Sequence, residues 1–152
     1  MKRVAVLAAV MVALAAAGGA FYLLQFFQPS SPSEGSINWR HDFHEALNLA
    51  QVEGKLLMME FYADWCGWCR KLDMETYTDP RLAAFLNEEF IPLKIDVENR
   101  ENLVLADRYR VWELPTIVFL TPAGEEVGRI VGYRPPDAFR REALAILEQW
   151  ER

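Results

Sequence analysis

Two cysteines separated by two residues, Cys66 and Cys69, constrain this chain more than any other feature, and they are its only cysteines. A largely apolar run over residues 55–62 leads into the pair, and a run compatible with a helix, residues 69–75, follows it. This order of strand, tight turn and helix places Cys66 at a helix N-terminus, where unpaired backbone N–H groups and the helix dipole favour negative charge. Because the thiolate is the reactive form of cysteine, the segment predicts redox chemistry.

Other uses of the two cysteines are disfavoured. A zinc site made only of cysteines needs four of them. A structural disulfide contributes more stability when it closes a long loop, and this loop would be very short. A Cys-x-x-Cys pair beside a βαβ-type pattern is instead typical of a redox-active pair. We therefore expect no metal and no organic cofactor, with the Cys66–Cys69 pair as the redox group.

Length and charge limit the possible partners. The 152 residues leave room for one membrane or targeting segment and one domain of a little over a hundred residues. The formal net charge is −6, from 16 basic and 22 acidic side chains, and the basic residues form no cluster. An acidic domain of this kind argues against nucleic acid as a partner.

The N-terminal segment begins with Lys2 and Arg3 and then has no charged side chain before Glu34. Since about 20 apolar residues cross a bilayer as a helix, residues 4–27 predict an uncleaved anchor in the inner membrane. The alternative is a cleaved signal peptide, whose apolar core is about 7–15 residues long, with its cleavage site among residues 15–20. Lys2 and Arg3 should stay in the cytoplasm, so under both interpretations the rest of the chain faces the periplasm.

The chain is expected to have three parts. Residues 1–27 form the anchor or signal segment, residues 28–37 form a flexible tether rich in proline and serine, and residues 38–152 form the folded domain. In the domain, helical spacing over 39–52, 69–75, 81–90, 99–109 and 137–150 alternates with apolar runs over 55–62, 90–97, 115–120 and 126–131. The order α-β-α-α-β-α-β-β-α predicts an α/β fold, a central mixed sheet of about four strands with helices on both faces.

Two histidines, His41 and His44, lie three residues apart on the first predicted helix. They could form part of a metal site, but such a site needs ligands that converge, and no third ligand cluster accompanies them. We interpret both as ordinary solvated histidines.

The segment from Trp65 to Cys69, together with the later Leu114-Pro115-Thr116, resembles the thioredoxin superfamily. The resemblance covers roughly residues 38–150 and includes Glu60, which precedes the first cysteine by six residues. Residues 73–80 look like the branch that contains the C-terminal domain of periplasmic thiol–disulfide interchange reductases. The resemblance implies a thioredoxin-like fold and an anchored thiol–disulfide oxidoreductase. Its partners would be disulfide-containing client proteins and an electron donor in the membrane.

The resemblance also implies a role for each residue of the site. Cys66 would attack a client disulfide, and Cys69 would resolve the mixed disulfide that forms. Pro115 matches the family's cis proline, which places a backbone edge beside the cysteines so that a client chain can add to it as a strand. The alternative is a trans proline at the start of an edge strand. The residues expected to bind the client are Trp65, Gly67, Trp68, Leu114, Pro115 and Thr116. Of the two tryptophans, we assign Trp65 to packing against the sheet and Trp68 to contact with the client.

Glu60 occupies the position where many thioredoxins hold a buried aspartate. Burial on an apolar strand would raise its pKa, so that it could take and return the proton of Cys69. The alternative is a carboxylate at the strand end that faces water. The sequence departs from the family at one point: Pro92 takes the place of the buried lysine that thioredoxins pair with this acid, and Lys94 is expected to be solvated.

The direction of electron flow depends on the residues between the cysteines. A histidine there would stabilise the thiolate and make the pair more oxidising, and Gly67-Trp68 contains none. Its absence favours reduction of client disulfides, and a reductase for the haem-site cysteines of cytochrome c would differ only in its client. The alternatives are a disulfide oxidant or isomerase, and a client-binding or chaperone module whose cysteine pair stays idle.

Overall fold

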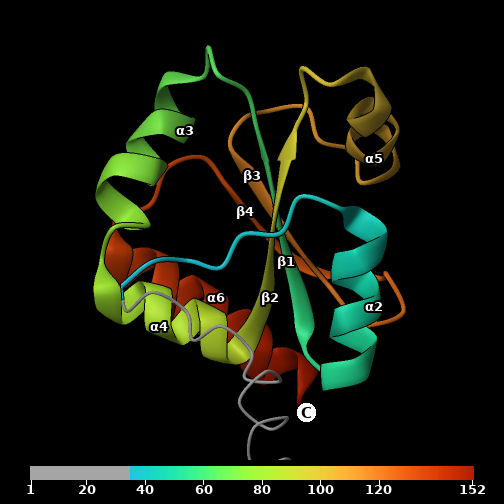
Figure 1. Ribbon diagram of the computed structural model, residues 1–152. Helices are drawn as coiled ribbons and strands as arrows, with labels where there is room; N and C mark the ends of the chain where they lie inside the picture. The colour runs from blue at the N-terminus through green and yellow to red at the C-terminus, as the bar shows by residue number, and fades with distance from the viewer. Residues whose placement is uncertain (1–34) are drawn as a thin grey trace, which may run out of the picture. The chain divides into compact units, whose positions relative to one another are not determined.

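Figure 1 shows the computed structural model of the chain, which describes residues 35–152. The predicted anchor or signal segment, residues 1–27, and residues 28–34 of the predicted tether lie outside the described residues. Among the residues that are described, no helix combines the length and the apolar character needed to cross a membrane.

The helices and strands follow one another in the predicted order. They are α2 (Phe43–Glu53), β1 (Leu56–Tyr62), α3 (Gly67–Lys71), the π-helical turn η1 (Leu72–Thr76), α4 (Pro80–Glu89), β2 (Phe90–Asp96), the 3₁₀ turn η2 (Arg100–Asn102), α5 (Leu103–Arg108), β3 (Thr116–Leu120), β4 (Glu126–Val131) and α6 (Pro136–Trp150). The first helix starts later than predicted because Asp42 caps it, accepting a hydrogen bond from the backbone N–H of Glu45 at 2.7 Å.

The strands form one mixed sheet in the order β2-β1-β3-β4, which confirms the predicted sheet. β1 pairs in parallel with β2 and antiparallel with β3, and β3 pairs antiparallel with β4. β1 is therefore a central strand, and all of its residues except Tyr62 are buried. Such burial is expected for a strand that is covered on both faces.

Side chains of β1 alternate between two cores, one on each face of the sheet. Leu56 and Met58 belong to the core that α4, α6 and η1 cover, whereas Leu57, Met59 and Phe61 belong to the core that α2 and α5 cover. Figure 1 shows α4 and α6 on one side of the sheet and α2 and α5 on the other. The prediction of helices on both faces is thus confirmed.

Candidate active site

Cys66 and Cys69 form a disulfide at the start of α3, with their Cα atoms 5.3 Å apart. Cys66 is the N-cap of this helix, as predicted, and its Sγ accepts a hydrogen bond from the backbone N–H of Cys69 at 3.1 Å. Cys66 is 5% exposed and Cys69 only 1%, so Cys66 is the cysteine more open to an incoming reagent. A backbone N–H donor at a helix N-terminus also stabilises a thiolate at the capping position.

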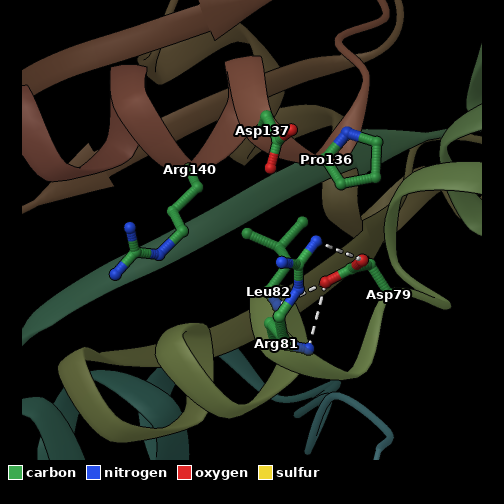
Figure 2. A pocket seen from close by; sticks show the side chains of 6 residues that line it. All are labelled: Asp79, Arg81, Leu82, Pro136, Asp137 and Arg140. Atoms are coloured by element: carbon green, nitrogen blue, oxygen red, sulfur yellow. Dashed lines mark hydrogen bonds and ion pairs between the residues drawn. The ribbon is translucent and has the colours of Figure 1, made fainter.

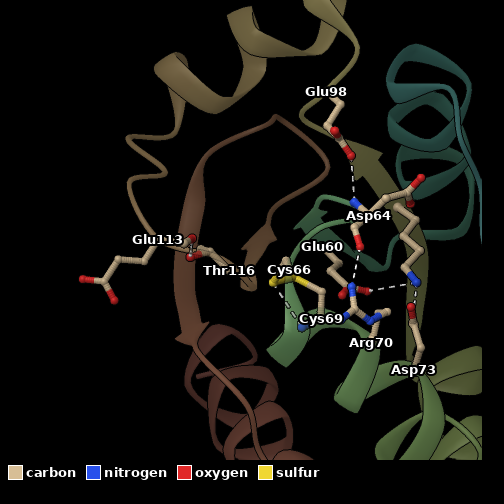
Figure 3. The surroundings of a disulfide bond; sticks show 10 residues. Glu60, Asp64, Cys66, Cys69, Arg70, Asp73, Glu98, Glu113 and Thr116 are labelled. Atoms are coloured by element: carbon tan, nitrogen blue, oxygen red, sulfur yellow. Dashed lines mark hydrogen bonds and ion pairs between the residues drawn. A yellow bond between two sulfur atoms is a disulfide. The ribbon is translucent and has the colours of Figure 1, made fainter.

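The turn that leads into α3 is held at the backbone of Asp64. Its N–H donates to Glu98 Oε2 at 2.8 Å, and its carbonyl accepts from Arg70 Nη1 at 2.7 Å (Figure 3). The N–H of Cys66 in turn donates to the carbonyl of Ala63 at 3.1 Å. These bonds tie the turn to the loop after β2 and to α3, so the position of Cys66 is fixed by the fold itself.

The Leu114–Pro115 peptide bond is cis, as the resemblance implies. Leu114 packs against the cluster that contains both cysteines, so the turn before β3 lies beside the disulfide. Thr116 is buried at the start of β3, and its hydroxyl donates to the carbonyl of Glu113 at 2.7 Å (Figure 3). The fold therefore brings this turn and the cysteine pair together, although they are far apart in the sequence.

Both tryptophans of the motif are exposed, Trp65 by 68% and Trp68 by 58%. The packing role predicted for Trp65 is therefore wrong. In the turn from β1 to α3 the buried positions are those of Ala63 and Cys66, and the Trp65 side chain between them faces solvent. Gly67 is exposed as well. The surface around the disulfide, here called its rim, therefore carries two accessible indole rings, those of Trp65 and Trp68.

Glu60 is fully buried, which confirms the predicted burial over the alternative of a carboxylate that faces water. It shares the face of β1 that η1, α4 and α6 cover, because it alternates with Leu56 and Met58. Burial raises the pKa of its carboxyl to about 8; the Lys94 ammonium opposes this shift, and the Asp73 carboxylate adds to it. The hydroxyl of Tyr77, which is buried with Glu60, also opposes the upward shift of this pKa.

Lys94 is not solvated, so that prediction is also wrong. Its side chain is 12% exposed, and the residue pairs with Glu60 across the parallel strands β1 and β2. Its Nζ lies 4.0 Å from Glu60 Oε2 and contacts Asp73 Oδ1, and it sits 4.8 Å from the ring centre of Tyr62. Lys94, and not the position of Pro92, therefore supplies the largely shielded lysine beside the acid.

Two further residues of the site, Asp73 and Tyr133, were missed by sequence analysis. Asp73 lies four residues after Cys69, so helical spacing was a signal that could have placed it on the inner side of the helix. Tyr133 follows β4, and its ring contacts that of Trp68 with the ring centres 5.9 Å apart. No pattern in the sequence links Tyr133 to the cysteines, because this contact depends on the loop between β4 and α6.

The rest of the described surface holds no comparable group of reactive side chains. His41 and His44 are both exposed, and residues 35–152 contain no cluster of three potential metal ligands. A hollow between the starts of α4 and α6 contains two arginines, Arg81 and Arg140, beside the carboxylates of Asp79 and Asp137 (Figure 2). None of the predicted site residues lines it, so the disulfide remains the candidate active site.

Comparison with known proteins gives the same assignment. The thiol:disulfide interchange protein DsbD of Salmonella typhi is 30% identical over 122 residues, which are 75% of this chain and 21% of that protein. The chain thus spans about a fifth of the length of the curated relatives it matches. A thioredoxin structure from Thermus thermophilus is 39% identical with a TM-score of 0.63, over 75% of this chain and 86% of that one. The reduced C-terminal domain of DsbD from Neisseria meningitidis is 25% identical with a TM-score of 0.58, over 70% and 91%.

The structure thus combines a mixed sheet, a Cys-x-x-Cys disulfide at a helix start and a neighbouring cis proline, an arrangement suited to thiol–disulfide exchange. The family model described as thioredoxin-like domain matches residues 43–146. The chain belongs to this thioredoxin-like family.

Proposed function

We propose that the chain reduces disulfides in extracytoplasmic proteins and is anchored in the inner membrane by residues 4–27. The observation that most supports the disulfide chemistry is the Cys66–Cys69 pair at a helix start beside the cis Leu114–Pro115 turn. This arrangement puts the attacking sulfur next to a backbone edge on which an extended client chain can lie. The name of the DsbD relatives, thiol:disulfide interchange protein, supports the same class of reaction.

The reaction cycle consists of two exchanges. In the reduced form, the Cys66 thiolate attacks one sulfur of a client disulfide, and the other client sulfur leaves as a thiolate. Cys69 then attacks the Cys66 sulfur, which releases the second client sulfur and forms the Cys66–Cys69 disulfide. Two electrons and two protons have then passed from the cysteine pair to the client. A dithiol donor in the membrane restores the pair by the reverse exchange, because the periplasm is an oxidising compartment.

Glu60 is the group to which we assign the proton of Cys69, which must leave before that sulfur can attack. A carboxyl with a pKa of about 8 can accept and return a proton near neutral pH. The Lys94 ammonium, 4.0 Å from Glu60 Oε2, stabilises the ionised form that accepts the proton. Trp68 and the Leu114–Pro115 turn are the parts of the rim to which we assign contact with the client.

Reduction is the direction we propose because Gly67-Trp68 contains no histidine that would stabilise the Cys66 thiolate. The reduction potential of the Cys66–Cys69 pair, measured against glutathione, tests this direction. A value near that of thioredoxin, about −270 mV, supports a reductant, and one near about −120 mV supports an oxidant.

The mechanism is tested by trapping the mixed disulfide. Replacing Cys69 with serine leaves Cys66 able to attack but removes the thiol that resolves the intermediate. The full chain with Cys69→Ser should accumulate covalent client complexes that dithiothreitol releases, whereas the matched Cys66→Ser variant should accumulate none. Equal amounts of complex with the two variants would contradict the assigned roles. Failure of the unmodified chain to reduce insulin disulfides would favour an idle client-binding module instead.

A further inference from the structure

The loop of residues 132–135 connects β4 with α6, and its backbone is hydrogen-bonded on both sides of the disulfide site. The Gly132 N–H donates to the carbonyl of Pro115 at 2.8 Å, and Gly132 has a φ of 82°, a conformation that favours glycine. At the other end of the loop, the carbonyl of Arg134 accepts from the Thr76 hydroxyl at 2.6 Å. The loop therefore joins the cis-proline turn to η1, and Tyr133 stands between these two attachments.

Tyr133 makes a set of contacts that converge on Trp68. The two rings are inclined by 31° with their centres 5.9 Å apart. The Lys71 ammonium lies over both rings, 4.6 Å from the centre of Tyr133 and 5.5 Å from that of Trp68. The Tyr133 hydroxyl donates to Glu75 Oε2 at 2.8 Å, and the same oxygen lies 3.9 Å from Lys71 Nζ. Tyr133 is thus held by its hydroxyl, its ring and the two ends of its loop.

These contacts matter because Trp68 is 58% exposed, yet its indole contacts the Tyr133 ring and lies under the Lys71 ammonium. An exposed side chain without partners occupies several rotamers, and fixing it when a client binds costs part of the binding free energy. An indole already held in one orientation avoids that cost. It also offers a rigid aromatic surface, the kind of group that dominates binding energy at protein interfaces.

We propose that Tyr133 is a positioning residue for client specificity. It holds the Trp68 indole beside the disulfide so that the site favours disulfides within polypeptide chains over small-molecule disulfides. A polypeptide chain that lies along the Leu114–Pro115 turn also reaches the indole, whereas a small disulfide needs contact only with the sulfur of Cys66. The inference rests on the proposed function and adds to it the residue that orients Trp68 for polypeptide clients.

The test compares the rates at which the reduced full-length chain is oxidised by insulin and by hydroxyethyl disulfide. Tyr133→Leu removes the ring, and Tyr133→Phe keeps the ring but loses the hydrogen bond to Glu75. Tyr133→Leu should slow the reaction with insulin about fivefold, the effect of losing one aromatic pair of ordinary strength. The rate with hydroxyethyl disulfide should change less than about twofold, since no rim contact is lost there. Tyr133→Phe should restore most of the insulin rate.

Two further arms separate positioning from a general effect on the fold. Lys71→Gln removes the cation over both rings while Tyr133 stays unchanged. It should slow the reaction with insulin and leave the reaction with hydroxyethyl disulfide nearly unchanged. Val104→Ala, which truncates a side chain that is 71% exposed on α5, is the control and should change neither rate. The ¹⁵N relaxation of the Trp68 indole N–H, assigned with Trp68→Phe, should report faster motion in Tyr133→Leu than in the unmodified chain.

The outcomes are distinguishable. An unchanged insulin rate in Tyr133→Leu, or equal losses with insulin and hydroxyethyl disulfide, would overturn the positioning role while the reductase activity stands. An unmodified chain that reduces neither substrate would overturn the proposed function and this inference with it. An unchanged Trp68 indole relaxation in Tyr133→Leu would show that Tyr133 does not hold the ring, whatever the rates.

Discussion

Replacing Glu60 with glutamine should make the stability of the oxidised protein less dependent on pH. The Glu60 carboxyl is fully buried with a pKa of about 8, against 4.5 for an ordinary glutamate. Between these values the native state keeps a proton that the unfolded chain has lost, so native stability falls as the pH rises. Each pH unit well inside that window is worth about 1.4 kcal/mol. The slope is smaller near its two ends, so the loss between about pH 5 and pH 8 is about 3–4 kcal/mol for this one group.

Glutamine has nearly the same shape as glutamic acid and cannot ionise. We therefore expect Glu60→Gln to unfold with a free energy close to that of the unmodified chain at about pH 5 and about 3–4 kcal/mol higher at pH 8. Urea unfolding of the oxidised protein at several pH values measures this difference. The oxidised form is the right one because its cysteines are joined in the disulfide and do not titrate.

The matched control is Glu113→Gln, which removes an exposed carboxylate on the turn before β3. A surface change of this kind should alter the unfolding free energy by less than about 0.5 kcal/mol. If the curves of unfolding free energy against pH for Glu60→Gln and the unmodified chain ran parallel from pH 5 to pH 8, the buried acid would not hold its proton through this range. The assignment of Glu60 as a proton carrier would then lose its physical basis.

Three further outcomes follow from the same contacts. Asp73→Asn removes a carboxylate that raises the pKa of Glu60, and it leaves Lys94 paired with Glu60 alone. A carbon-13 carboxyl titration should therefore show the Glu60 pKa falling below about 8. An unchanged pKa would contradict the shared ion pair. In the reduced protein, iodoacetamide should modify Cys66 before Cys69, because Cys66 is the more exposed of the two; mass spectrometry of partly modified protein decides the order. Asp79→Ala removes the N-cap of α4, whose carboxylate accepts hydrogen bonds from the N–H groups of Arg81 and Leu82 at 3.0 and 2.8 Å. Urea unfolding should show a free energy of unfolding lower by about 1 kcal/mol. Equal stability would show that the cap is not formed.

The fold was predictable because each element carries its own local signal. The apolar run that became β1, the Asp79-Pro80 start of α4 and the glycine that ends α2 are short-range features, and the structure has an element boundary at each. The placement of Cys66 at a helix start followed from the same local order of strand, turn and helix. The burial of Glu60 was also predictable, because it stands inside an apolar strand.

The polar surroundings of Glu60 were not predictable, because they depend on how β1 and β2 are aligned. Glu60 pairs with Lys94 in the parallel ladder, and Lys94 then meets Asp73 from η1. Successive side chains of a strand point to opposite faces of the sheet. If β2 were shifted by one residue along β1, Leu93 or Ile95 would lie beside Glu60, and Lys94 would point into the core that α2 and α5 cover. A buried ammonium without a carboxylate there would be costly, whereas the observed alignment gives it two. The acid, the lysine and the apolar residues on both faces therefore favour the same alignment, which a strand considered alone does not reveal.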